Sequence, residues 1–132
     1  MKTPCEIVVW YVLPTIRREI AKELVDTFRM KQVDVGHLFG VTDAAISQYL
    51  KKKRGGNVWI ESSERYPEFL EEIKVSAKRI HENNSDIAKE MCRLCRFIKN
   101  IGILAEVYKG STGDDLPQCE WDGEIITQIK SE

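Results

Sequence analysis

The stretch QVDVGHLFGVTDAAISQYL, residues 32–50, decides the fold. It predicts a short helix from Gln32 to Phe39, a tight turn, and a second helix that Thr42 caps and that runs to about Lys52. Gly40 stands at the turn, where a glycine adopts a positive φ at little cost. Gly36 stands where the second helix crosses the first closely. The apolar residues expected to hold the two helices together are Val35, Phe39, Val41, Ile46 and Tyr49.

This spacing is typical of a helix-turn-helix, which reads double-stranded DNA with the N-terminal end of its second helix in the major groove. Gln48 can hydrogen-bond a base edge, best an adenine, and Ala44 can touch a thymine methyl. Gln32, at the start of the first helix, is expected to bind phosphate instead. The residues expected to face the groove are Thr42, Asp43, Ala44, Ser47 and Gln48.

A run of four cations follows the second helix and would grip the DNA backbone without reading its sequence. From residue 14 to residue 56, nine Lys and Arg stand against five Asp and Glu, a net charge of +4, whereas residues 57–132 carry −5. The basic first half is therefore the part expected to meet a polyanion. The alternative to DNA binding is that this region is simply a three-helix core with a solvated basic tail. The four cations are Lys51, Lys52, Lys53 and Arg54.

The rest of the chain predicts an all-α protein. Thr3 can cap a first helix with Pro4 at its first position, although the apolar run that follows could equally be a short buried strand. Pro14 is expected to break or kink whatever precedes it. Apolar residues at helical spacing then predict long helices over residues 66–80 and 87–108, separated by the polar HENNSD. Residues 109–120 lack periodicity and read as irregular.

Two regions follow from this pattern. Residues 1–56 are expected to form the helix-turn-helix DNA-binding domain, and residues 57–132 a helical dimerisation and cysteine-cluster region. The longest apolar run, IVVWYVL, is too short to span a membrane, and the start of the chain lacks the pattern of a secretion signal. We therefore expect a cytoplasmic protein without a membrane partner.

Four cysteines raise the question of a metal. Cys92 and Cys95 stand three apart in an expected helix, with Cys95 on the shoulder of its apolar stripe and Cys92 off it, so a core role suits both poorly. Neighbouring Arg and Lys would favour their thiolates. Cys119 lies in the aperiodic stretch, which a metal bond could tie down. The predicted metal ligands are Cys5, Cys92, Cys95 and Cys119.

The spacing of the cysteine pair favours iron–sulfur over zinc. Residues three apart on a helix have Cβ atoms roughly 5–6 Å apart, which suits the ligands of a 4Fe–4S cluster better than those of one tetrahedral zinc. Zinc is the alternative cofactor, and a metal-free dithiol switch or structural cysteines are further readings. Because Cys5 and Cys119 each stand alone in the sequence, the four cysteines indicate a metal site less strongly than two C-x₂-C motifs would.

The segments PCEIVVWYVLPTIRREIAKEL and QVDVGHLFGVTDAAISQYLKKKRG resemble the Cro/C1-type (XRE-like) transcriptional regulators of archaea. The resemblance covers about residues 4–56 and, more loosely, the helical remainder. It implies DNA binding, usually as a homodimer. Related segments in that family are joined to a thiamine-phosphate synthase-like domain, for which we expect this chain to be too short, so no thiamine role carries over. The family more often has alanine at the position of Gly36, which should loosen the first helix slightly.

The sequence thus predicts a sequence-specific transcriptional regulator that binds a pseudo-palindromic operator as a homodimer and senses redox or iron state through its cysteines. The alternative is an interaction module of antitoxin or adaptor type that uses the helix-turn-helix as a scaffold, with structural zinc or no metal. No P-loop, dinucleotide-binding glycine pattern or serine nucleophile elbow is present, so we do not expect an enzyme.

Overall fold

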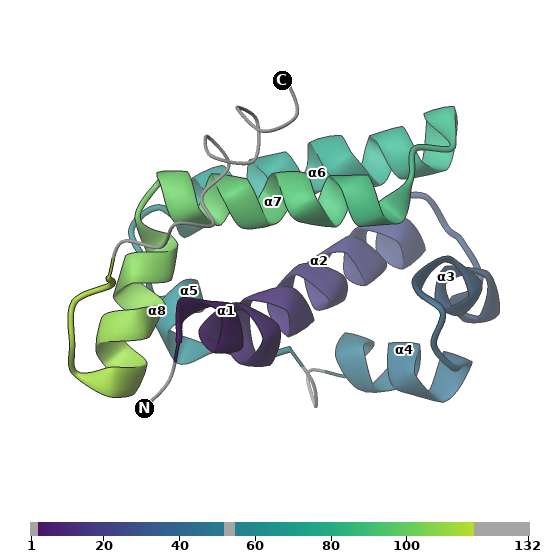
Figure 1. Ribbon diagram of the computed structural model, residues 1–132. Coiled ribbons are helices and arrows are strands. Elements are labelled where there is room, and N and C mark those ends of the chain that lie inside the picture. Colours follow the sequence, from purple (N-terminus) through teal and green to yellow (C-terminus); the bar gives the residue numbers. More distant parts are fainter. Residues whose placement is uncertain (1–2, 52–54, 118–132) are drawn as a thin grey trace, which may run out of the picture.

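The structure is a computed structural model that describes residues 3–51 and 55–117. Every regular element in these two ranges is a helix (Figure 1), which confirms the all-α prediction. Lys52, Lys53, Arg54 and Cys119 lie outside the described residues. The elements are α1 (Pro4–Ile7), the π-helix η1 (Val8–Val12), α2 (Leu13–Asp26), α3 (Gln32–Phe39), α4 (Asp43–Leu50), α5 (Val58–Glu61), α6 (Tyr66–Asn83), α7 (Ile87–Asn100) and α8 (Ile103–Thr112).

The first helical segment begins as the sequence predicts. The side chain of Thr3 accepts a hydrogen bond from the backbone N–H of Glu6, at 3.3 Å. Pro14 cannot donate a backbone hydrogen bond. The chain widens into the π-helix η1 just before it, and the N–H of Leu13 donates to the carbonyl of Val8. The helical path therefore continues through Pro14 into α2 instead of ending there.

Helix α2 is the centre of the molecule. It packs against α3 and α4 on one side and against α6 and α7 on the other (Figure 1). Burying one large aliphatic side chain completely contributes about 1.5–3 kcal/mol. One core cluster includes residues from Ile7 to Tyr108, so the two sides of the predicted boundary at residue 56 share a core. Four apolar residues of α2 in this core are completely buried: Ile16, Ile20, Ala21 and Leu24.

Helices α6 and α7 are joined by a buried polar network. The carboxylate of Glu90 accepts hydrogen bonds from the hydroxyls of Ser76, at 2.8 Å, and Ser85, at 2.9 Å, and from the guanidinium of Arg93. Burial by itself would raise the pKa of Glu90, but these hydrogen bonds and the charge of Arg93 outweigh it and lower the pKa. The predicted polar break lies between the two helices, where Asn84 takes a left-handed conformation with φ 50°.

The predicted single helix over residues 87–108 is wrong. α7 ends at Asn100, Gly102 adopts a φ of 90°, and α8 runs from Ile103 to Thr112. The first residues of the stretch expected to be irregular are therefore helical. α8 packs on α5, an element that the sequence did not predict. A Cβ at Gly110 would lie 2.1 Å from the indole nitrogen of Trp59, so only glycine allows this approach.

Within residues 3–51 and 55–117, no helix has both the length and the apolar character needed to cross a lipid bilayer.

Candidate nucleic-acid interface

Helices α3 and α4 are joined by a tight turn at Gly40. This glycine has a left-handed conformation, with φ 68° and ψ 32°, as the sequence predicts. The N–H of Val41 donates to the carbonyl of Gly36 at 2.9 Å and closes the end of α3. The hydroxyl of Thr42 accepts from the N–H of Ala45 at 3.1 Å and caps α4. The first helix has its predicted bounds, and the second ends at Leu50, two residues earlier than expected.

Gly36 allows the turn to lie directly against α3. A Cβ at this position would lie 2.8 Å from the carbonyl oxygen of Val41 and 3.4 Å from the carbonyl carbon of Thr42. Both are backbone atoms, which cannot rotate away as a side chain could. The close approach at Gly36 is thus between α3 and the backbone that leads from the turn into α4.

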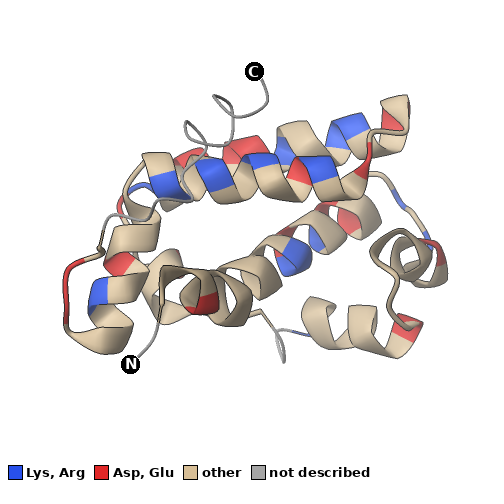
Figure 2. Cartoon of the chain, viewed as in Figure 1, with Lys and Arg blue, Asp and Glu red and all other residues tan. Residues whose placement is uncertain are grey.

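The side chains of α4 divide into an inner and an outer face. Ala45, Ile46 and Tyr49 are buried against the core. On the outside, Ser47 is partly exposed and the other residues expected in the groove are exposed. Helix α4 carries one charged residue, the acidic one in its first turn (Figure 2), where the helix dipole stabilises it. The exposed residues predicted to touch bases are Thr42, Asp43, Ala44 and Gln48.

The remaining predicted contacts lie at the ends of the two helices. Gln32 is exposed at the first position of α3, and Lys51 is exposed at the C-cap of α4. Both stay predicted phosphate contacts. The other three cations of the basic run fall in residues 52–54, outside the described residues.

The chain that leaves the basic run is fixed to α2 at Gly55. This residue has φ 80°, and a Cβ on it would lie 2.7 Å from the carbonyl oxygen of Pro14 and 2.8 Å from Cβ of Arg18. The hydroxyl of Thr15 lies 2.6 Å from the carbonyl oxygen of Gly55 and donates to it. Gly55, the first described residue after the basic run, is therefore held against the start of α2.

The described cysteines do not gather within the chain. Cys5 on α1 and Cys92 on α7 are exposed, and Cys95 is partly buried. In the described part of the chain, no group of three or more His, Cys, Asp or Glu side chains is placed to hold a metal ion. The predicted fourth ligand, Cys119, lies outside the described residues, so the cluster stays a prediction.

The structure corrects the expectation that basic neighbours favour a thiolate at Cys95. Burial and, to a smaller extent, the nearby Cys92 raise the pKa of Cys95 to about 11, and Arg17 offsets only part of this rise. The helical-wheel positions are confirmed, because Cys95 lies at the edge of the core and Cys92 faces outward.

Comparison with protein-family models, with curated proteins and with solved structures finds no match to this chain. The resemblance to Cro/C1-type regulators thus rests on the residues quoted from positions 4–56 and stays a prediction.

Proposed function

We propose that α3 and α4 form a helix-turn-helix and that the chain is a sequence-specific DNA-binding transcriptional regulator. The observation that supports this best is the two-sided character of α4. Its inner face is packed on the core, while its N-terminal end presents small and polar side chains outward. Such an end can enter the major groove without a bulky side chain in the way.

In the proposed complex, base reading and backbone binding are separate tasks. Gln48 would donate to and accept from an adenine edge, while Ala44 would contact a thymine methyl. Lys51 and the cations at positions 52–54 would neutralise phosphates, which makes the affinity dependent on salt. Of these cations, Lys51 is described, and it is exposed at the C-cap of α4, beside the proposed reading helix.

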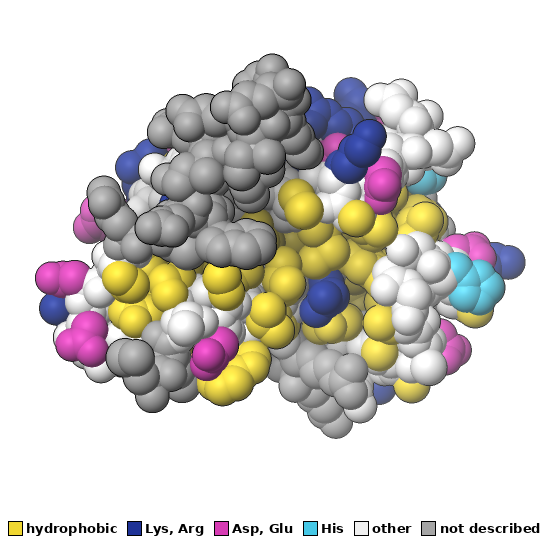
Figure 3. Space-filling view, viewed as in Figure 1, with side chains coloured by type: hydrophobic (Ala, Val, Ile, Leu, Met, Phe, Trp, Pro, Cys, Tyr) yellow, Lys and Arg dark blue, Asp and Glu magenta, His cyan; other side chains and the backbone are white. Residues whose placement is uncertain are grey.

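A single reading helix makes few base contacts, so we infer that the protein binds its operator as a homodimer. The two half-sites would then lie about 34–36 Å apart, or a multiple of that distance. Hydrophobic side chains gather on the face formed by α1, α2 and α7 (Figure 3). Val9 of η1, at 55% exposure, is an apolar side chain that a partner subunit could cover. Sedimentation at several concentrations would measure the association.

The decisive experiment selects duplexes from a random DNA library and measures their affinity by fluorescence anisotropy. Replacing Gln48 by alanine should cost about 1–3 kcal/mol and relax the preference at one base position. Replacing residues 51–54 by alanine should weaken binding to all sequences and reduce the salt slope by about 1 per cation removed.

A charge-matched control distinguishes a local contact from a loss of overall positive charge. It replaces four exposed cations of α6 and α7 by alanine, and should retain most of the affinity because these residues lie on other helices. An equal loss in both variants, or failure to select any sequence, would favour the alternative of a protein-binding adaptor. The four control positions are Lys78, Lys89, Arg96 and Lys99.

A further inference from the structure

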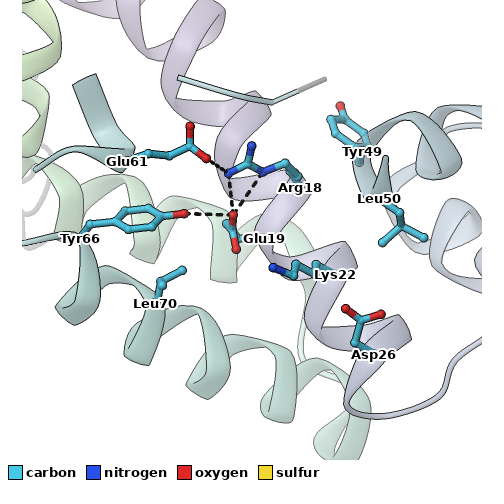
Figure 4. Close-up of a pocket in the computed structure, with 9 residues that line it drawn as sticks. All are labelled: Arg18, Glu19, Lys22, Asp26, Tyr49, Leu50, Glu61, Tyr66 and Leu70. Atoms are coloured by element: carbon cyan, nitrogen blue, oxygen red, sulfur yellow. Dashed lines mark hydrogen bonds and ion pairs between the residues drawn. The ribbon is translucent and has the colours of Figure 1, made fainter. Parts of the chain in front are cut away.

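A cavity of about 290 Å³ lies between α4 and α6, alongside α2. Tyr49 and Leu50 of α4 line one side, and Tyr66 and Leu70 of α6 line the other, with α2 between them (Figure 4). Its volume is near the lower end of small-molecule sites, which are about 300–1,000 Å³. The cavity thus lies at the junction between the proposed reading helix and the rest of the protein.

A buried polar network forms one wall of this cavity. Oε1 of Glu19 accepts hydrogen bonds from Nη2 of Arg18, at 2.7 Å, and from the hydroxyl of Tyr66, at 3.1 Å. Arg18 also donates to Glu61 at 2.6 Å. Burial by itself would lower the pKa of Arg18, but the two carboxylates outweigh it and raise the pKa. Burial and the charge of Glu19 raise the pKa of Tyr66, so its hydroxyl stays protonated as a donor.

The other oxygen of Glu19 is left open. All the hydrogen bonds to this carboxylate from residues that the structure describes end on Oε1. In Figure 4, one oxygen lies where the dashed lines meet and the other points away from them. The residue is only 7% exposed, and it lines the cavity. Among the described residues no buried side-chain oxygen lacks a hydrogen-bond partner, so Oε2 is accessible to solvent at the cavity wall and is an acceptor that a bound molecule in the cavity can use.

The charges around the cavity favour a cation. Three carboxylates line it, against two cations, which gives a net charge of −1. Arg18 already bonds two of the carboxylates, and the third, on Asp26, lies toward the other end of α2 from Glu61 (Figure 4). The leucines and tyrosine rings of the opposite walls offer apolar surface to a short hydrocarbon chain. The charged residues that line the cavity are Arg18, Glu19, Lys22, Asp26 and Glu61.

We propose that this cavity binds a small primary ammonium ion on a short apolar chain, with the ammonium donating to Oε2 of Glu19. Because its walls come from α2, α4 and α6, the ligand would fix the position of α4 relative to the core. If the proposed DNA binding holds, the same ligand would tune operator affinity. The site itself needs no DNA, so the two ideas can be tested apart.

The first test is an NMR titration of the full chain at constant ionic strength. The probes are 1,4-diaminobutane, L-leucine and 1,4-butanediol. Leucine carries a primary ammonium next to a carboxylate, and the diol is a neutral control. The diamine should cause saturable shifts at the amides of Leu50, Tyr66 and Leu70, and the diol should cause none. Shifts of the same amides with leucine would support the site and show that it also accepts an ammonium with a carboxylate next to it. Equal shifts with amine and diol, or none with either amine, would overturn the proposal.

Variants then locate the ammonium. Glu19→Gln replaces the open acceptor by an N–H donor and should weaken diamine binding about tenfold or more. Leu70→Trp leaves the network intact, fills the cavity and should abolish the shifts even if Glu19→Gln fails to fold. Glu23→Gln is the matched control, because Glu23 lies on the same helix and bonds the exposed Thr27. Unchanged binding in Leu70→Trp would overturn the site.

Operator affinity is measured last, with and without diamine, in the wild type and in Leu70→Trp. A change in the wild type alone supports coupling between the cavity and α4. Saturable binding without any change in operator affinity overturns the coupling and leaves the site supported. A wild-type protein that binds diamine but no DNA contradicts the proposed function and not the site.

Discussion

The hydroxyl of Thr15 donates to the carbonyl of Gly55 across 40 residues of sequence, at 2.6 Å. Thr15 is completely buried, so this bond joins the start of α2 to the chain that leaves the basic run. It fixes Gly55, which directly follows the segment that we expect to contact phosphates.

Replacing Thr15 by valine should therefore destabilise the fold. The side chain keeps its shape, but the partly buried carbonyl of Gly55 loses its donor, which costs about 1–3 kcal/mol. Urea unfolding measures this loss. Thr27→Val is the control, because its hydroxyl is exposed and its loss should change stability by less than about 0.5 kcal/mol. Similar effects of the two substitutions would contradict the role assigned to this bond.

Replacing Gly36 by alanine should have two opposing effects on stability, through helix propensity and through packing. Alanine should gain about 1 kcal/mol in a helix interior, but its methyl would lie 2.8 Å from the carbonyl oxygen of Val41. Overpacking against backbone costs about 1–3 kcal/mol, so we expect a net loss of stability, seen as a lower midpoint of thermal unfolding. Gly40→Ala is a useful comparison, because it meets no atom within 4 Å and tests only the strain of a positive φ. A more stable Gly36→Ala variant would show that the turn can move away.

Acid should weaken the contact between α6 and α7. The pKa of Glu90 is lowered from its ordinary value of 4.5 in the folded chain, so this carboxylate contributes stability that is complete above that value. The contribution is lost as the pH falls through the lowered, folded-state pKa. Glu90→Gln should therefore be less stable at neutral pH and show a flatter decline in acid, measured by unfolding between pH 7 and pH 2. An unchanged acid decline would show that other carboxylates control it.

The cysteines can be told apart by their reaction with a maleimide. Cys92 is exposed and should react quickly, whereas Cys95 should react slowly, because it is partly buried and its pKa is raised to about 11. If the predicted 4Fe–4S centre forms, anaerobically purified protein should be brown, should hold about four iron atoms per cluster, and should protect Cys92. Colourless, iron-free protein with full operator affinity would contradict the proposed sensor. Zinc in its place would support the alternative cofactor.

The sequence predicts the local features of this fold well, because each depends on a few adjacent residues. The cap at Thr3, the bounds of α3, the left-handed Gly40 and the cap at Thr42 are all confirmed. The break at Gly102 was missed because apolar residues continue at helical spacing on both sides of it, at Ile98 and at Ala105.

The cavity could not be predicted from the sequence. Tyr66 meets Glu19 across 47 residues, and Glu61 meets Arg18 across 43, so no local pattern indicates the network. The neighbouring pair Arg18 and Glu19 looks like an ordinary solvated pair on a helix surface. Only the packing of α6 over α2 buries this pair and places the carboxylate of Glu19 beside the cavity.

The position of α2 has a consequence for how this protein can be cut or recombined. Its apolar side chains hold α4 on one side and α6 on the other. A fragment that stops at residue 56 would expose to water the side of α2 that packs against α6, and we expect it to aggregate rather than to bind an operator. If the proposed DNA binding holds, changing its specificity would accordingly mean exchanging the outward residues of α4 alone and leaving the shared helix untouched.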